Sequence, residues 1–425
     1  MTSALATLVG RPVHNVFRRA EIKRRQSSDG KFESSWTDIS AFVKQWGQFG
    51  SAVDDVRLNR FTHEGMSLIV RNDTGRFNPE ADGNSLWNGY LTRYRTLVRV
   101  QAGYYDENDS ELPTETTQGI FVMTNEIPIS GQTNEATIGC RSLVSIFDEV
   151  RAVEVAGLGA TQSASDIVAK IRDHTDGASN FVFREFITST AWTIQTTTSN
   201  YNLATTGSLA NMTCWDLMTK VAEAEGYVVL VNRTGGVEFR NRDERSSVSA
   251  FDLFGQFFPE QNVIALEEIK EPLDRSYNYF RLKYLTADTS TSYVSAGTST
   301  ALSATNVPWK YGARIYSFEN DFFNTSTAQL SVNNLYNTLA FLSSKQDVVL
   351  RCKFMPSVEC LDRVDVSYHS YSLVAATLWD FFDWDNADWD AEFGENINWD
   401  AKAFKVVGKM TDLDQLTTTL RLQEL

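Results

Sequence analysis

The stretch Leu68-Ile-Val-Arg-Asn-Asp-Thr-Gly-Arg-Phe-Asn-Pro79 combines a strand signal with a turn signal. Its apolar start, together with Ser67, is typical of a short β-strand, and the run from Asn72 to Gly75 is rich in turn-forming residues. Similar short segments recur through the first 150 residues, at 15–25, 97–103, 119–124 and 136–141. Such a series of short strands separated by turns predicts a β-barrel or β-sandwich.

The composition narrows the classes of protein that the chain can belong to. The 425 residues include 39 basic and 54 acidic side chains, a net charge of −15, so the chain is a poor candidate for binding nucleic acid through its phosphates. We expect no membrane-spanning segment, because no apolar run is long enough for a transmembrane helix. We expect no signal peptide, because no basic residue precedes the short apolar run 4–9. Four cysteines do not indicate a disulfide framework.

The composition changes after about residue 155, where helix signals begin. Ser163 and Thr213 each precede an amphipathic run with an Asp three residues later, which predicts two capped helices. A hairpin over 227–240 follows, turning at Gly235. Strands return from about 270, at 279–285, 347–354 and 416–422, with one further helix after Ser326. We therefore predict a mainly β, α+β fold: two barrel-like β domains, 1–155 and 269–425, that flank a middle α+β domain, 156–268.

Two blocks of the sequence share a loose pattern. The first runs from 97 to 143 and the second from 363 to 425, and each reads as strand, excursion, strand, turn and strand. Chance similarity is the alternative, because the spacing differs between the blocks. If the repeat is real, the first and last domains are related.

The excursion of the second block, residues 379–401, is the most unusual stretch of the chain. It contains eight acidic residues, no Lys or Arg, and Trp379, Trp384, Trp389 and Trp399, each followed by Asp. The regular spacing favours a structural loop inserted in the last domain, and Trp also favours binding of protein or sugar. A glycosidase with paired carboxylates and a calcium site at Asp383, Asp385 and Asp388 are weaker alternatives. We predict no metal and no cofactor.

Enzymatic motifs are missing from the sequence. It has no glycine-rich phosphate loop and no Gly-x-Ser-x-Gly motif. Cys352, Cys360 and His369 do not have the spacing of a zinc site. We therefore predict that the chain is not an enzyme, although a catalytic triad formed in space would not be visible in the sequence.

Several stretches resemble tail proteins of long-tailed bacteriophages. Residues 68–79, Ser85-Leu-Trp-Asn-Gly-Tyr-Leu91 and Arg95-Thr-Leu-Val-Arg-Val100 resemble the first domain of such proteins. Tyr311-Gly312, the helix after Ser326, Leu361-Asp-Arg-Val364 and the final strand resemble the last domain of tail and baseplate hub proteins, including the hubs of contractile-tail baseplates. The resemblance covers most of the chain and rests on pattern, not on an invariant motif.

The resemblance implies a structural subunit of the phage tail tip or baseplate. The implied hub is a homotrimer in which two similar domains per chain form a pseudo-sixfold ring, joining a sixfold tail tube to a threefold central fibre or spike. Implied partners are the distal tail protein or tail tube, the fibre or spike, the tape measure protein, and genomic DNA that passes through the lumen without specific binding. The chain would be assembled in the host cytoplasm and reside in the virion.

The residues that we expect at interfaces are basic and aromatic. In the first domain they are Arg18, Lys23, Arg25, Trp87, Tyr90 and Arg95, and in the excursion they are Trp379, Trp384, Trp389 and Trp399. Two other functions remain open. One is a tail protein that binds host glycans through the Trp-Asp loop, and the other is a tail-associated hydrolase.

Overall fold

A computed structural model gives the architecture of the chain. It describes residues 15–53, 61–78, 83–91, 95–105, 117–124, 127–159, 162–201, 203, 209–241, 249–255, 258, 261–270, 279–285, 291–296, 315–320, 322, 346–371 and 395–425. Within these residues strands predominate, which confirms the mainly β prediction. The predicted helix after Ser326 and the excursion up to residue 394 lie outside them.

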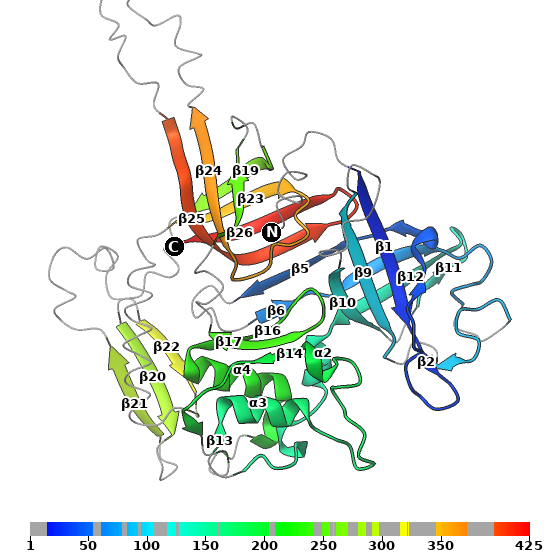
Figure 1. Ribbon diagram of the computed structural model, residues 1–425, viewed down its shortest axis with the longest axis horizontal. Coiled ribbons are helices and arrows are strands. Elements are labelled where there is room, and N and C mark those ends of the chain that lie inside the picture. The colour runs from blue at the N-terminus through cyan, green and yellow to red at the C-terminus, as the bar shows by residue number, and fades with distance from the viewer. Residues whose placement is uncertain are drawn as a thin grey trace, which may run out of the picture.

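The first half of the chain forms an eight-stranded sheet (Figure 1). The opening stretch of the sequence supplies β7, in which Met66, Leu68 and Val70 are buried, as expected for a strand with one face on a core. The sheet has the order β3 (Thr37–Asp38), β1 (Val16–Lys23), β9 (Leu97–Tyr104), β10 (Thr117–Met123), β12 (Glu135–Ser142), β7 (Met66–Arg71) and β4 (Val43–Gln45), and β11 (Ile129–Ser130) also pairs with β12.

A second eight-stranded sheet curls into a half-barrel (Figure 1). Its order is β18 (Ser249–Phe254), β24 (Arg363–Tyr371), β25 (Glu395–Asp412), β26 (Thr417–Glu424), β23 (Asp347–Lys353) and β19 (Val263–Lys270). Two strands of the first half complete it, since β5 (Gln48–Val53) pairs with the end of β25, and β6 (Phe61–His63) pairs with β5. The first half of the chain is therefore hydrogen-bonded into the last.

The two sheets have the same connectivity. Leaving aside the short strands β3 and β11 and the added β5 and β6, each sheet has six strands in the order 1-4-5-6-3-2, numbered along the chain. In both, the last three strands form an antiparallel meander, β9-β10-β12 in one and β24-β25-β26 in the other. These meanders are the two blocks that resemble each other in the sequence. The sheets differ at one edge, where β1 is antiparallel to β9 but β18 is parallel to β24.

Among the described residues, the α-helices are α2 (Val144–Asp148), α3 (Ala164–Arg172) and α4 (Cys214–Glu225). The helices α3 and α4 are the two predicted after Ser163 and Thr213, and α2 was not predicted. Ser163 caps α3, a capping box of Thr213 and Asp216 starts α4, and Gly226 in the left-handed conformation ends α4. The expected hairpin is β16 (Tyr227–Val231) and β17 (Val237–Asn241), and β14 (Trp192–Ile194) extends it.

Smaller elements complete the structure. The pair β13 (Gln162–Ser163) and β15 (Asn200–Tyr201) lies beside α3, and β2 (Arg25–Gln26) pairs with β8 (Tyr90–Leu91). A three-stranded sheet forms from β20 (Tyr279–Leu285), β21 (Thr291–Ala296) and β22 (Ile315–Glu319). Short 3₁₀ helices occupy Ser40–Phe42, Ala152–Glu154, Ser189–Ala191 and Leu209–Asn211.

The buried side chains form two cores. One contains the helices and the β16–β17 hairpin, and the other combines side chains from both large sheets, such as Leu68 and Phe121 with Phe354 and Leu420. Strands β18 and β19, placed in the middle domain by the sequence analysis, pair within the second large sheet, and the boundary at 268 falls inside β19. The domain limits stay a prediction. Within the described residues, no helix is both long and apolar enough to cross a membrane.

Candidate functional site

The basic side chains predicted on β1 are engaged within the chain. Arg18 donates from Nη1 to the carbonyl oxygen of Leu413 at 2.8 Å, and its guanidinium lies 5.4 Å from the ring centre of Trp46. Lys23 lies 5.9 Å from the ring of Trp36. Both residues are half-buried, so part of each surface remains open to a partner.

Two of the predicted interface residues are buried inside the chain. Arg25 is 5% exposed, forms an ion pair with Glu185, and stacks 4.2 Å from the ring of Phe32. Trp87 has no exposed surface and belongs to the core shared by the two large sheets. The side chains of Arg25 and Trp87 therefore stabilise the chain itself, and almost none of their surface is exposed to a partner.

Tyr90 lies in β8 of the small β2–β8 pair, Arg95 lies in the loop before β9, and both are half-buried. The guanidinium of Arg24 stacks 3.8 Å from the ring centre of Tyr90. Arg95 forms an ion pair of 2.9 Å with Glu149, which connects the loop before β9 to the end of α2. The contact of either residue with a partner stays a prediction.

Trp399 is the one tryptophan of the acidic excursion within the described part of the chain. It lies in β25, is 7% exposed, and packs 5.3 Å from Phe404 and 6.3 Å from Tyr368, measured between ring centres. Trp399 is therefore a core residue of the second sheet. The remaining site predictions for this stretch lie outside the described residues: Trp379, Trp384, Trp389, Asp383, Asp385 and Asp388.

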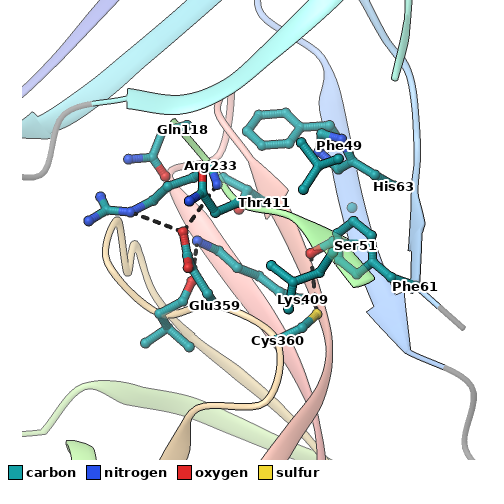
Figure 2. Close-up of a pocket in the computed structure, with 15 residues that line it drawn as sticks. Phe49, Ser51, Phe61, His63, Gln118, Arg233, Glu359, Cys360, Lys409 and Thr411 are labelled. Atoms are coloured by element: carbon teal, nitrogen blue, oxygen red, sulfur yellow. Dashed lines mark hydrogen bonds and ion pairs between the residues drawn. The ribbon is translucent and has the colours of Figure 1, made fainter. Parts of the chain in front are cut away.

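The sequence analysis missed a polar cluster where segments from three parts of the chain meet (Figure 2). His63 of β6, Ser51 of β5 and Lys409 of β25 are directly opposite one another across three hydrogen-bonded strands. Residues paired in this way have side chains on the same face of a sheet. We call these three residues, with Arg233, Glu359 and Cys360, the junction.

The turn of the β16–β17 hairpin and the loop before β24 cover this row. Arg233 donates from Nε to Glu359 at 3.3 Å, and its main-chain N–H donates to the same carboxylate at 3.1 Å. Lys409 donates from Nζ to the carbonyl oxygen of Val358 at 2.8 Å, while Ser51 Oγ and Cys360 Sγ are 3.3 Å apart. The junction therefore joins β5 and β6, from the N-terminal part of the chain, to the middle hairpin and to β25.

Burial controls the protonation of the junction. It lowers the pKa of His63 to about 4 and, with help from the nearby charge of Arg233, that of Lys409 to about 8. It also raises the pKa of the Cys360 thiol to about 11, so this thiol is protonated at neutral pH and is a weak nucleophile. The imidazole is neutral at the same pH.

The space at the junction is small. Its cavity of about 40 Å³ has room for only a few water molecules. Two buried polar atoms beside it, His63 Nδ1 and Thr411 Oγ1, have no hydrogen-bond partner within the described residues, and water would satisfy them. With a protonated thiol and no room for a substrate, the geometry of the junction suits a structural contact and does not suit catalysis.

The signal for the junction in the sequence is faint. His63, Ser51 and Lys409 each belong to a strand-like segment, but nothing local indicates that β5 leaves the first sheet to pair with β25. Within the described residues, no group of three or more His, Cys, Asp or Glu side chains has the arrangement of a metal site.

Solved structures of other proteins share this architecture. A tail protein from Neisseria meningitidis MC58 superposes with a TM-score of 0.51 at 11% identity, over 96% of this chain and 96% of that one. The 43 kDa tail protein of prophage MuSo2 from Shewanella oneidensis superposes with a TM-score of 0.50 at 10% identity, over 96% and 98%. The fold is that of phage tail proteins. This confirms the resemblance to tail proteins found in the sequence. The structural similarity extends over nearly the whole chain. No protein-family model matches the sequence, and no curated protein does.

Proposed function

We propose that the chain is a structural subunit of a phage tail, located at the tail tip or baseplate. In this role it is a trimeric hub that joins a sixfold tail tube to a threefold fibre or spike and surrounds part of the DNA channel. Its partners are copies of itself, the distal tail protein or tube, the fibre or spike, and the tape measure protein.

The equal connectivity of the two large sheets carries this proposal. Each chain has two sheets with the strand order 1-4-5-6-3-2, so three chains contribute six similar units. Six similar units from three copies can face a sixfold tube on one side and a threefold structure on the other. The full-length likeness to two tail proteins supports the same setting.

The role that we propose is structural rather than enzymatic. The junction has the residue types of a catalytic cluster, but its thiol is protonated and its cavity admits only water. Its hydrogen bonds and ion pair connect distant segments, which suits a subunit that must resist deformation during assembly.

Negative-stain electron microscopy of the purified protein tests the proposal. We expect class averages of a ring with threefold symmetry and six lobes around a central opening. Averages that show only single, asymmetric particles at every concentration would contradict the proposed trimeric hub. The chain would then be a subunit that joins the tail in another way.

Binding of host glycans is a second candidate, favoured by the composition of residues 379–401. Four Trp and eight acidic side chains in 23 residues offer both stacking surfaces and hydrogen-bond acceptors for sugars. Trp399 is buried, so the binding would fall to Trp379, Trp384 and Trp389. Titration with host-surface sugars, followed by Trp fluorescence, distinguishes this function from a purely structural one.

A further inference from the structure

Because the two large sheets have the same connectivity, the contact that β5 makes with one sheet predicts where an equivalent contact would form on the other. In the chain, β5 lies between β4 and β7, the second and third strands of the first sheet. It does not pair within the first sheet but with β25, the fifth strand of the other sheet. It pairs with Gly408–Asp412, the end of β25 just before the turn into β26.

The corresponding segment of the second sheet has no equivalent contact within the described chain. The segment between its second and third strands, β19 and β23, contains β20, β21 and β22. Figure 1 shows this small sheet on the far side of the molecule from the first large sheet, so it does not reach the first large sheet of its own chain. In the proposed trimer, a ring in which first and second sheets alternate would place this small sheet against the first sheet of the next copy.

One face of the small sheet is already used within the chain. Phe280 and Leu282 are fully buried, and Tyr316 and Phe318 pack against the core that contains α4. Asn320, which follows β22, donates from Nδ2 to the carbonyl oxygen of Lys220 and to Glu223 at 3.0 Å, which fixes β22 to α4. The small sheet is therefore held in a defined position, with its other face outward.

The outward face presents an aliphatic side chain to solvent. Ile315, at the start of β22, is 59% exposed, and β22 pairs only with β20 among the described strands. Lys283 and Glu319 form an ion pair of 2.8 Å on the same face, at the opposite end of β22 from Ile315. An exposed aliphatic side chain near charged groups, on a strand whose second edge is unpaired among the described residues, is the kind of surface that pairs with another protein.

The place where this surface would dock follows from the position of β5. Because β5 pairs with the end of the fifth strand, the equivalent place in the first sheet lies at the end of β10. Both edges of β10 are paired there, with β9 and β12, so the part left for a partner is the connection from β10 to β12. That connection contains β11, in which Ile129 is 40% exposed. Both ends of the expected contact therefore present an exposed isoleucine.

We propose that the β20–β21–β22 sheet of one copy docks, around Ile315, against the β10–β12 connection of the next copy, around Ile129. The contact is head-to-tail, so it closes into a ring when three copies join. It rests on the proposed trimer and adds the surfaces that form it.

Three single variants, compared by light scattering at equal concentration, test the contact. Ile315→Arg and Ile129→Arg each place a charge in the expected interface, and we expect each to weaken trimer association at least a hundredfold. Val153→Arg is the matched control, because Val153 is 60% exposed on the middle part of the chain and lies outside both surfaces. Circular dichroism checks that all three variants keep the wild-type fold.

The outcomes distinguish this contact from the hub itself. If the wild type is trimeric and the two Ile variants remain trimeric, the contact is wrong and the hub stands. If the Val153 variant dissociates as readily as the other two, the effect is not specific and the contact is again wrong. If the wild type is a monomer at every concentration, the proposed hub is the part that fails.

A cysteine pair gives a second readout. In Ile315→Cys/Ile129→Cys, mild oxidation should produce dimer and trimer bands on a non-reducing gel, while each single variant should remain monomeric because the contact is not symmetric. The four native cysteines are all buried and would not contribute to cross-linking. Ladders from either single variant would contradict the head-to-tail arrangement.

Discussion

Arg18 and Leu413 are 395 positions apart in the chain, yet the Arg18 guanidinium donates a 2.8 Å hydrogen bond to the Leu413 carbonyl oxygen. The bond connects β1 of the first sheet to the turn that joins β25 and β26. Trp46 N–H and Gly47 N–H reach the same turn, where they donate to Asp414 at 3.0 and 3.2 Å. The two large sheets are therefore joined by specific polar bonds as well as by a shared core.

Replacing Arg18 with Met should destabilise the protein by about 1–2 kcal/mol. The variant keeps most of the apolar stem but loses a charged hydrogen bond that is half-buried. Urea unfolding measures the change, with Lys31→Met, at an exposed turn position, as the control. Equal midpoints for wild type and Arg18→Met would show that the bond between the sheets contributes nothing.

Gly47→Ala should be more costly than Gly30→Ala by about 2 kcal/mol or more. Both glycines have a positive φ, +70° and +68°, so the backbone strain of alanine is similar at the two sites. A Cβ at Gly47 would lie 2.5 Å from the carbonyl oxygen of Ser67, whereas a Cβ at Gly30 would have nothing within 4 Å. Thermal unfolding of the two variants checks the difference, and equal losses would contradict the close approach of the strands at Gly47.

Acid should loosen the junction through His63. Burial lowers the pKa of His63 from 6.5 to about 4, so the unfolded chain binds one more proton than the folded chain between these values. The contribution of neutral His63 to the free energy of unfolding is therefore fully present above pH 6.5. It falls by about 2–3 kcal/mol as the pH drops toward 4. Lys409, Arg233 and Glu359 are the other charged groups of the junction, and a third positive charge beside its two cations is unfavourable.

The variant His63→Phe isolates this effect from other titrating groups. Its ring would stack between Phe61 and Phe121, as the imidazole does, and it cannot be protonated. Unfolding free energies measured from pH 7 to pH 4.5 should decline less for His63→Phe than for wild type. Parallel declines for wild type and His63→Phe would exclude His63 as the cause.

Replacing Trp384 and Trp389 together with Ala should leave the isolated chain folded but weaken its assembly. These residues belong to the acidic excursion, and Trp is enriched among residues that dominate binding energy at interfaces. The matched control replaces Phe381 and Phe382, in the same stretch, with Ala. Sedimentation of the variants with tail components, or particle infectivity, gives the readout, and normal assembly of the Trp variant would end this role for the excursion.

Local patterns predicted much of the fold. The strand-like run that starts at Ser67 identified β7, and Thr213 with Asp216 identified the start of α4, because these signals come from residues close in sequence. The two meanders also followed from the loose repeat between 97–143 and 363–425. The resemblance to tail proteins rested on the same stretches.

Pairing between distant segments could not be predicted in this way. Nothing around Gly50 and Ser51 indicates that their partners are Met410 and Lys409, because such pairing depends on how the sheets meet in space. The same limit explains the site residues. Arg25, Trp87 and Trp399 have the residue types of an interface, but contacts with distant parts of the chain bury them.

The mass of the protein in solution tests the central claim most directly. Light scattering over a wide range of concentrations should give a trimer, three times the chain mass of 47.8 kDa, that dissociates only on dilution. A mass of 47.8 kDa at every concentration would contradict a hub that forms its ring from copies of this chain alone.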